Sequence, residues 1–140
     1  MIEMKVLVSG DRYYTDWDCI RHCLHSLSKP NELPWSSKRK PHEIVIIQAE
    51  CCGADSLAKS IASELGYQGR GYPTKRSLGR KARPLRNREM LSREQPQLIL
   101  IFHDNLDESK ETKNFIAQAR QICPRTTIYH IHGHNWTKLQ

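Results

Sequence analysis

Glu43-Ile44-Val45-Ile46-Ile47 is the stretch of sequence that decides the fold. Its apolar residues follow one another without polar alternation, which indicates a strand buried on both faces. Such strands are typical of a parallel sheet covered by helices on each side. Further strands are expected at residues 6–8, 68–73, 98–102 and 127–131.

Helical patterns lie between these strands. Thr15 can cap a helix whose apolar face continues to Leu27, and Gly66 suits the end of a helix that begins after Gly53. Ser109 can cap a later helix that ends before Pro124. The alternating order predicts one α/β domain with a mostly parallel five-stranded sheet and helices on both faces. Residues 28–42 are expected to be a loop insertion without a packed role, and residues 133–140 a C-terminal tail.

The length and composition bound the class of protein. With 140 residues the chain is long enough for one domain with a substantial core. No apolar run approaches the roughly 20 residues that would span a membrane. Met1–Val6 leads almost directly into a strand, without the layout of a signal peptide. The five cysteines are odd in number and lack CxxC spacing, which favours a reducing, cytoplasmic location over disulfides or zinc.

The net charge of +7 permits binding of nucleic acid or of an anionic small molecule. Nine of the basic residues lie between Arg70 and Arg93, against the single acidic residue Glu89. Pro84 is expected at the first position of a helix over about 84–94, so Arg86, Asn87 and Arg88 would occupy its first turn. Such a helix start favours phosphate, although a merely solvated charged face is an equal alternative.

Ligands of such sheets bind at the carboxyl ends of the strands, where the strand order reverses. The candidate loops are therefore Ser9–Arg12, Gln48–Asp55 and His103–Thr112, and the basic segment is expected to close over them.

Four motifs in this order resemble the SLOG superfamily, in particular its YspA-like branch, over roughly residues 4–132. They are Val8-Ser9-Gly10-Asp11-Arg12, Gly53-Ala54-Asp55-x-Leu57-Ala58, Pro84-x-Arg86-Asn87-Arg88-Glu89-Met90-Leu91 and Ser109-x-x-Thr112. The resemblance implies a single Rossmann-like three-layer domain that binds a nucleotide or a nucleotide-derived ligand. Relatives include LOG phosphoribohydrolases and DprA-type DNA-processing proteins, and homo-oligomers are common among them.

The family motifs match this chain at Gly10, Arg12, Gly53, Ala54, Asp55, Arg86, Asn87, Ser109 and Thr112, and no cofactor or metal is expected. The predicted ligand-binding residues are Ser9, Gly10, Arg12, Glu50, Gly53, Asp55, Arg83, Arg86, Asn87, Ser109 and Thr112. The chain departs from the family at Gln48-Ala49-Glu50-Cys51-Cys52, where two glycines and an arginine of the family motif are replaced. Asn114 stands where the phosphoribohydrolases carry a carboxylate, and an amide cannot perform its acid–base work.

Structural alternatives exist for several of these residues. Arg86 could pair with Asp11 or Asp104, and Asp55 is more readily interpreted as a helix cap than as a ligand contact. The pair Cys51-Cys52 is interpreted as small apolar filler rather than as a nucleophile. His130, His132 and His134 are interpreted as solvated side chains rather than as a metal site. One of Tyr13, Tyr14 and Trp17 could stack on a base, or these residues could belong to the core or to an interface.

The leading hypothesis is a binding module that senses or sequesters a nucleotide signal, as in nucleotide-signalling and conflict systems. The alternative is a nucleotide phosphoribohydrolase or N-glycosidase, in which Glu50 or Asp104 would replace the missing carboxylate. The lowest-ranked alternative is a nucleic-acid-binding protein that uses the basic segment 70–93.

Overall fold

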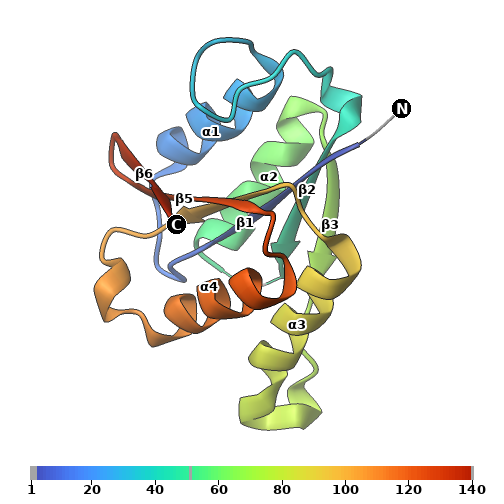
Figure 1. Ribbon diagram of the computed structural model, residues 1–140, viewed down its shortest axis with the longest axis vertical. Helices are drawn as coiled ribbons and strands as arrows, with labels where there is room; N and C mark the ends of the chain where they lie inside the picture. Colours follow the sequence, from blue (N-terminus) through green and yellow to red (C-terminus); the bar gives the residue numbers. More distant parts are fainter. Residues whose placement is uncertain (1–2, 51, 140) are drawn as a thin grey trace.

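A single sheet forms the centre of the protein. The computed structural model describes residues 3–50 and 52–139. The strand order is β3-β2-β1-β4-β5-β6, with β1 (Met4–Gly10), β2 (Ile44–Ala49), β3 (Gln68–Tyr72), β4 (Leu98–Phe102), β5 (Thr127–His132) and β6 (Asn135–Leu139). Strands β1 to β5 are parallel and β6 runs antiparallel to β5. The expected α/β class and Rossmann-like three-layer architecture are confirmed (Figure 1).

Helices cover both faces of the sheet. In Figure 1, α1 (Trp17–His25) and α2 (Ala54–Leu65) lie on one side, and α3 (Ala82–Glu94) and α4 (Lys110–Ile122) on the other. In the described residues, four short 3-10 helices occupy the connections, at Ser26–Ser28, Pro41–Glu43, Arg76–Lys81 and Leu106–Glu108. No helix in the described part of the chain is long and apolar enough to cross a membrane.

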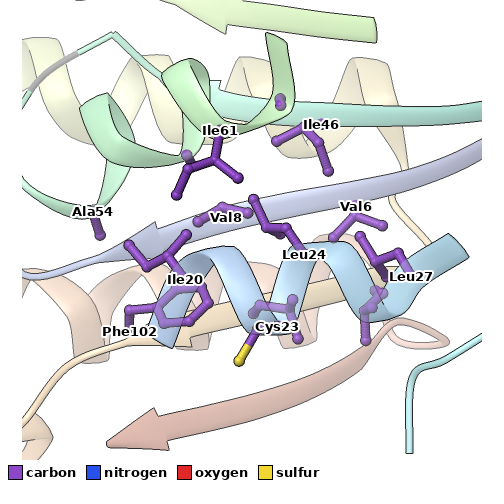
Figure 2. Packing of buried hydrophobic residues seen from close by; sticks show 14 of the residues in the cluster. Val6, Val8, Ile20, Cys23, Leu24, Leu27, Ile46, Ala54, Ile61 and Phe102 are labelled. Atoms are coloured by element: carbon purple, nitrogen blue, oxygen red, sulfur yellow. The ribbon is translucent and has the colours of Figure 1, made fainter. Parts of the chain in front are cut away.

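Successive strand residues face opposite layers and divide the core in two. Val6 and Val8 pack with the residues of α1 and α2, whereas Leu7 between them packs with those of α3 and α4. Figure 2 shows Ile20 and Leu24 of α1 directed toward this sheet face. Burial on both faces explains why the central strands are continuously apolar.

The helix boundaries follow local chemistry, with two corrections. Asp16, not Thr15, caps α1, and its side chain accepts a hydrogen bond from the Cys19 amide at 3.1 Å. Helix α3 begins at Ala82, so Pro84 is its third residue. A proline is still accommodated there because the first four amides of a helix lack intrahelical partners. The predicted Ser109 cap of α4 is confirmed.

Two segments that were expected to be irregular take part in packing. Trp35 of the 28–42 segment is buried, donates from Nε1 to the Cys23 carbonyl at 3.0 Å and packs against Tyr129. The expectation that this segment lacks a packed role is therefore wrong. Most of the expected tail forms β6, which makes the sheet six-stranded, because Gly133 (φ 58°) turns the chain back along the edge of β5.

Candidate functional site

A cavity of about 520 Å³ lies at the carboxyl ends of β1 and β2. The strand order reverses at β1, because the chain adds β2 and β3 on one side and then returns to place β4 on the other. Helices α3 and α4 form the outer walls. This position is the one at which parallel α/β sheets bind ligands.

Most of the predicted ligand-binding residues line this cavity. They are Ser9, Gly10, Arg12, Asp55, Arg83, Arg86, Asn87 and Thr112. Glu50, Gly53 and Ser109 are not among the described residues that line it. The cavity thus brings together residues from all four sequence motifs, which lie far apart in the sequence.

Gly10 and Gly53 hold the backbone of the site together. A Cβ at Gly10 would overlap the carbonyl of Phe102, whose oxygen accepts the Asp11 amide at 3.0 Å. Gly53 has φ 60°, and a Cβ there would overlap the carbonyl oxygens of Asp11 and Arg12. Only glycine permits both this conformation and this approach. Gly53 therefore supports the site from behind the cavity wall.

Four arginines supply the positive charge of the cavity, namely Arg12, Arg80, Arg83 and Arg86. Arg86 donates from Nε to Asn87 Oδ1 at 2.8 Å and from Nη1 to the Tyr72 carbonyl at 3.4 Å. Because α3 begins at Ala82, Arg86 lies in its second turn and not in the first, as expected from the sequence. The guanidinium groups of Arg83 and Arg86 are chemically suited to an anion, and both residues line the cavity.

Arg83 and Glu111 form an ion pair across the cavity, between α3 and α4. Both side chains are partly exposed, so we attribute little stability to this pair. Its consequence is local: it holds the guanidinium of Arg83 toward α4.

Asp55 and Gln118 line the same cavity, and each has one buried side-chain oxygen, Asp55 Oδ1 or Gln118 Oε1, without a hydrogen-bond partner among the described residues. Burial raises the pKa of Asp55 to about 7, although the charge of Arg86 acts in the opposite direction. The residue before α2 is Gly53, and no side chain of the described residues caps that helix. The interpretation of Asp55 as a helix cap is therefore wrong. Gln118 is oriented by its Nε2, which donates to the Pro84 carbonyl at 3.2 Å.

The two weak catalytic candidates lie elsewhere. Glu50 ion-pairs with Lys59 at 3.6 Å and its side chain lies against Gly71. Asp104 is exposed, and it is not among the described residues that line the cavity.

Ser109 caps α4 and donates to Thr112 Oγ1 at 2.9 Å. Thr112 is thereby oriented, and it is the member of this motif that reaches the cavity.

The remaining singled-out residues are placed as follows. Tyr14 is buried 5.8 Å from the ring of Phe102, so it belongs to the core, whereas Tyr13 and Trp17 are exposed. Cys52 is exposed and lines the cavity, so it is not apolar filler. Cys51 lies outside the described residues.

The rings of His130 and His132 lie beside each other, with centroids 5.0 Å apart. The Nε2 atom of His130 lies 2.7 Å from the carbonyl oxygen of His103. His134 is in the turn after β5, next to Gly133. Among residues 3–50 and 52–139 there is no group of three or more His, Cys, Asp or Glu side chains that could hold a metal ion.

The sequence prediction missed several residues of the cavity, notably Arg80, Glu111, Gln118 and Gln121, together with the apolar floor of Val8, Ala49, Met90 and Phe115. One signal for the polar ones was available. On α4, Glu111, Asn114, Gln118 and Gln121 follow helical spacing and form a polar stripe beside the buried residues.

No protein-family model, curated protein or solved structure matches this chain. The resemblance to the SLOG superfamily therefore rests on the four motifs alone. The position of the cavity and the residues that line it are independent of that resemblance, because they follow from the sheet topology and the packing.

Proposed function

We propose that this protein binds a nucleotide or a nucleotide-derived small molecule in the cavity between β1, α3 and α4, as a sensor or a sequestering protein. The cavity volume of about 520 Å³ lies within the range usual for small-molecule sites. Its apolar floor and its few polar groups are also typical of such sites. Binding of this kind needs no further cofactor.

The observation that carries the proposal is the combination of guanidinium groups with unpartnered acceptors. The arginines suit phosphate oxygens, which accept hydrogen bonds. Asp55 Oδ1 and Gln118 Oε1 need hydrogen-bond donors, which an inorganic anion at neutral pH largely lacks. A nucleotide carries both kinds of group, since its phosphates are anionic and its sugar hydroxyls donate. Pro84 and Ala117 line the cavity and are exposed, so they offer apolar surface for a base.

Isothermal titration calorimetry with AMP, ADP, cyclic mononucleotides, cyclic dinucleotides and ADP-ribose tests the proposal. We expect micromolar or tighter binding of at least one of them, and a loss of at least tenfold in Arg86→Ala. Arg88→Ala is the matched control, because Arg88 is an exposed arginine of the same helix that does not line the cavity. Absence of binding to every compound, or equal losses in both variants, would contradict the proposal.

Hydrolysis of the ligand is a second candidate, favoured by one observation. Asp55 is a carboxylate in the cavity whose pKa is raised to about 7 by burial, which suits a general acid or base near neutral pH. Asp55 would then do the work of the carboxylate that the phosphoribohydrolases carry at the position of Asn114. Neither Glu50 nor Asp104 would be needed for it. Base release from AMP that is abolished in Asp55→Asn supports this activity, whereas binding without base release restricts the protein to a binding role.

Two further expectations stay predictions. A nucleic-acid function through the basic segment 70–93 would appear as oligonucleotide binding that weakens steeply with salt. Self-association, which the family resemblance implies, is measured by light scattering on the purified chain.

A further inference from the structure

Two contacts join the outer walls of the candidate nucleotide site, α3 and α4. Gln118 Nε2 donates to the Pro84 carbonyl at 3.2 Å, and the Arg83 guanidinium pairs with the Glu111 carboxylate. All four of these residues line the cavity. The first contact is a neutral hydrogen bond to the backbone, whereas the second engages a guanidinium group that is suited to phosphate. Glu111 therefore contacts a group that an anionic ligand would also use.

Glu111 carries a charge of the same sign as the expected ligand. Among the described residues that line the cavity, four are arginines and only Asp55 and Glu111 are acidic. Carboxylate and phosphate groups both present their oxygens to the forked N–H donors of a guanidinium. The position of the Glu111 carboxylate at Arg83 is therefore one in which a phosphate oxygen would also be recognised.

Exchange of this carboxylate for another anion would cost little. The side chains of Arg83 and Glu111 are 38% and 69% exposed, so water can solvate both charges once they separate. Glu111 also lies in the first turn of α4, where the helix dipole favours its charge whether or not it is paired. Arg86 differs, because its guanidinium donates to Asn87 Oδ1 and to the Tyr72 carbonyl.

We propose that Glu111 is a built-in competitor of the ligand, which holds Arg83 in the ligand-free protein and is displaced when a phosphate group of the ligand binds to Arg83. The inference rests on the proposed function, because it assigns one arginine of that site to the phosphate. A phosphate group can replace Glu111 because it carries more charge than a carboxylate and offers three oxygens. A neutral nucleoside lacks a group that could do so.

Modification of arginine by phenylglyoxal tests the exchange, with inorganic pyrophosphate as the anionic probe. The rate at each arginine is measured by peptide mass spectrometry in the wild type, in Glu111→Gln and in Glu89→Gln. Glu111→Gln removes the charge at nearly constant size. Glu89→Gln is the matched control, because Glu89 pairs with Arg93 on an exposed face of α3 and does not line the cavity. Arg88, an exposed arginine of the same helix outside the cavity, is the reference within each protein.

The first measurement is made without pyrophosphate. Relative to Arg88, we expect Arg83 to react at least threefold faster in Glu111→Gln than in the wild type, because the charge of its partner is gone. The ratio is expected to stay unchanged in Glu89→Gln. Equal ratios in all three proteins would overturn the proposal, because Glu111 would then not hold Arg83 in solution.

The second measurement adds increasing concentrations of pyrophosphate. We expect pyrophosphate to protect Arg83 from modification, and the half-protecting concentration to fall at least threefold in Glu111→Gln, where no carboxylate has to be displaced. In Glu89→Gln it is expected to equal that of the wild type. Pyrophosphate that leaves Arg83 unprotected, or that protects it equally in Glu111→Gln and in the wild type, overturns the proposal.

These measurements distinguish failure of this inference from failure of the proposed function. Nucleotide binding in the calorimetric titrations, combined with an Arg83 that pyrophosphate does not protect, overturns the inference and leaves the proposed function standing. Protection of Arg83 that strengthens in Glu111→Gln, combined with absence of nucleotide binding, supports the exchange of anions at Arg83 and contradicts the proposed function.

Discussion

Gly10 and Gly53 are the residues on which the geometry of the candidate site depends most directly. At Gly10 the end of β1 passes against the Phe102 carbonyl of β4, and at Gly53 the start of α2 passes against the backbone of the loop after β1. The Ala54 amide donates to the Asp11 carbonyl at 3.2 Å across this second contact. Neither contact leaves room for a side chain. A larger residue at either position would therefore shift the backbone that shapes the cavity.

Gly10→Ala is expected to destabilise the protein by about 2–4 kcal/mol, because the added methyl group overlaps a main-chain carbonyl that cannot move without shifting β4. The control is Gly69→Ala on β3, where a Cβ meets nothing within 4 Å. Urea unfolding of both variants measures the difference. A cost at Gly10 no larger than that at Gly69 would contradict the steric argument.

The pH dependence of stability provides a test of the buried state of Asp55. Its pKa in the folded protein is about 7, above its ordinary value of 3.8, so the folded state favours the neutral acid. The contribution of Asp55 is therefore most favourable below about pH 4 and falls as the pH rises to about 7. We expect Asp55→Asn to be about 2–4 kcal/mol more stable than the wild type at pH 8 and nearly equal to it at pH 4.

Urea unfolding of the wild type and of Asp55→Asn across this pH range measures the difference directly. Because both proteins share every other titrating group, their difference isolates Asp55. A difference that is independent of pH would show that Asp55 ionises as a solvated carboxylate does.

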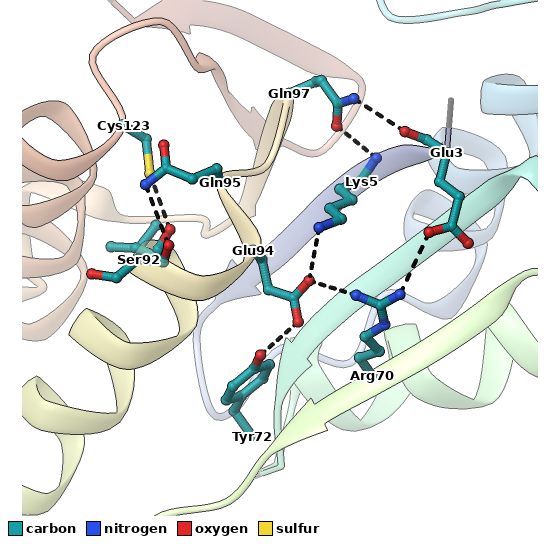
Figure 3. A network of polar contacts seen from close by, with 10 residues as sticks. Glu3, Lys5, Arg70, Tyr72, Ser92, Glu94, Gln95, Gln97 and Cys123 are labelled. Carbon is teal, nitrogen blue, oxygen red and sulfur yellow. Dashed lines mark hydrogen bonds and ion pairs between the residues drawn. The ribbon is translucent and has the colours of Figure 1, made fainter. Parts of the chain in front are cut away.

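At the scale of elements, α3 connects the cavity to a polar network near the opposite edge of the sheet. Its amino-terminal half carries two of the four cavity arginines, Arg83 and Arg86, and its last residue, Glu94, is buried. Figure 3 shows the Glu94 carboxylate in contact with side chains of β1 and β3. The distances to Arg70 Nη1, Tyr72 Oη and Lys5 Nζ are 2.8, 2.5 and 3.5 Å.

The contacts of Glu94 outweigh the cost of its burial. Burial by itself would raise the pKa of this carboxyl, but the hydrogen bond from Tyr72 and the charges of Arg70 and Lys5 together hold it below its usual value. Its pairing therefore stabilises the fold above the ordinary pKa of 4.5, and this contribution is lost as the pH falls below that value.

Glu94→Ala is expected to cost about 3 kcal/mol at pH 7, because it leaves Lys5 and Arg70 without this partner and removes the link between α3 and the sheet. Glu89→Ala is the matched control on the same helix. Glu89 pairs with Arg93 at 3.0 Å on an exposed face, and its loss is expected to cost at most about 0.5 kcal/mol. The two variants are compared by urea unfolding at pH 7, and equal costs would contradict a stabilising role for the network.

At the scale of the whole molecule, the cavity at the carboxyl ends of β1 and β2 differs in charge from a second cavity, of about 440 Å³, which lies between the start of α1 and the turn that joins β5 to β6. One is lined by arginines and the other by Asp16 and Asp18. The second cavity exists because the 28–42 segment and the β5–β6 hairpin close over α1, where Trp35, Tyr129 and Trp136 form an aromatic cluster. The insertion and the hairpin thus extend the core beyond the five parallel strands.

Trp35→Ala is expected to destabilise the protein by about 3–5 kcal/mol, because it leaves a large cavity beside Tyr129. The control is Trp17→Ala, which removes a partly exposed tryptophan and is expected to change stability by less than about 1 kcal/mol. Thermal and urea unfolding measure both changes. A similar small effect of the two substitutions would show that the insertion does not contribute to the core.

The sequence by itself determined the layers and most of the site. Continuous apolar runs identify strands with two covered faces, and helical spacing identifies the helices between them, because both patterns are local consequences of burial. The position of Gly10, Arg12, Arg86 and Thr112 around one crevice followed from the parallel order, since the carboxyl ends of parallel strands meet at one edge.

Only the tertiary structure decided which side chains reach the cavity and which do not. Glu50 turns toward Lys59 instead, while Gln118 enters the wall through a contact with a residue of another helix. The strand β6 and the burial of Trp35 were also decided at this level, because both depend on an edge and an aromatic cluster that exist only once distant segments have packed. Side-chain direction and edge pairing are set by neighbours in space, and local sequence patterns carry little information about them.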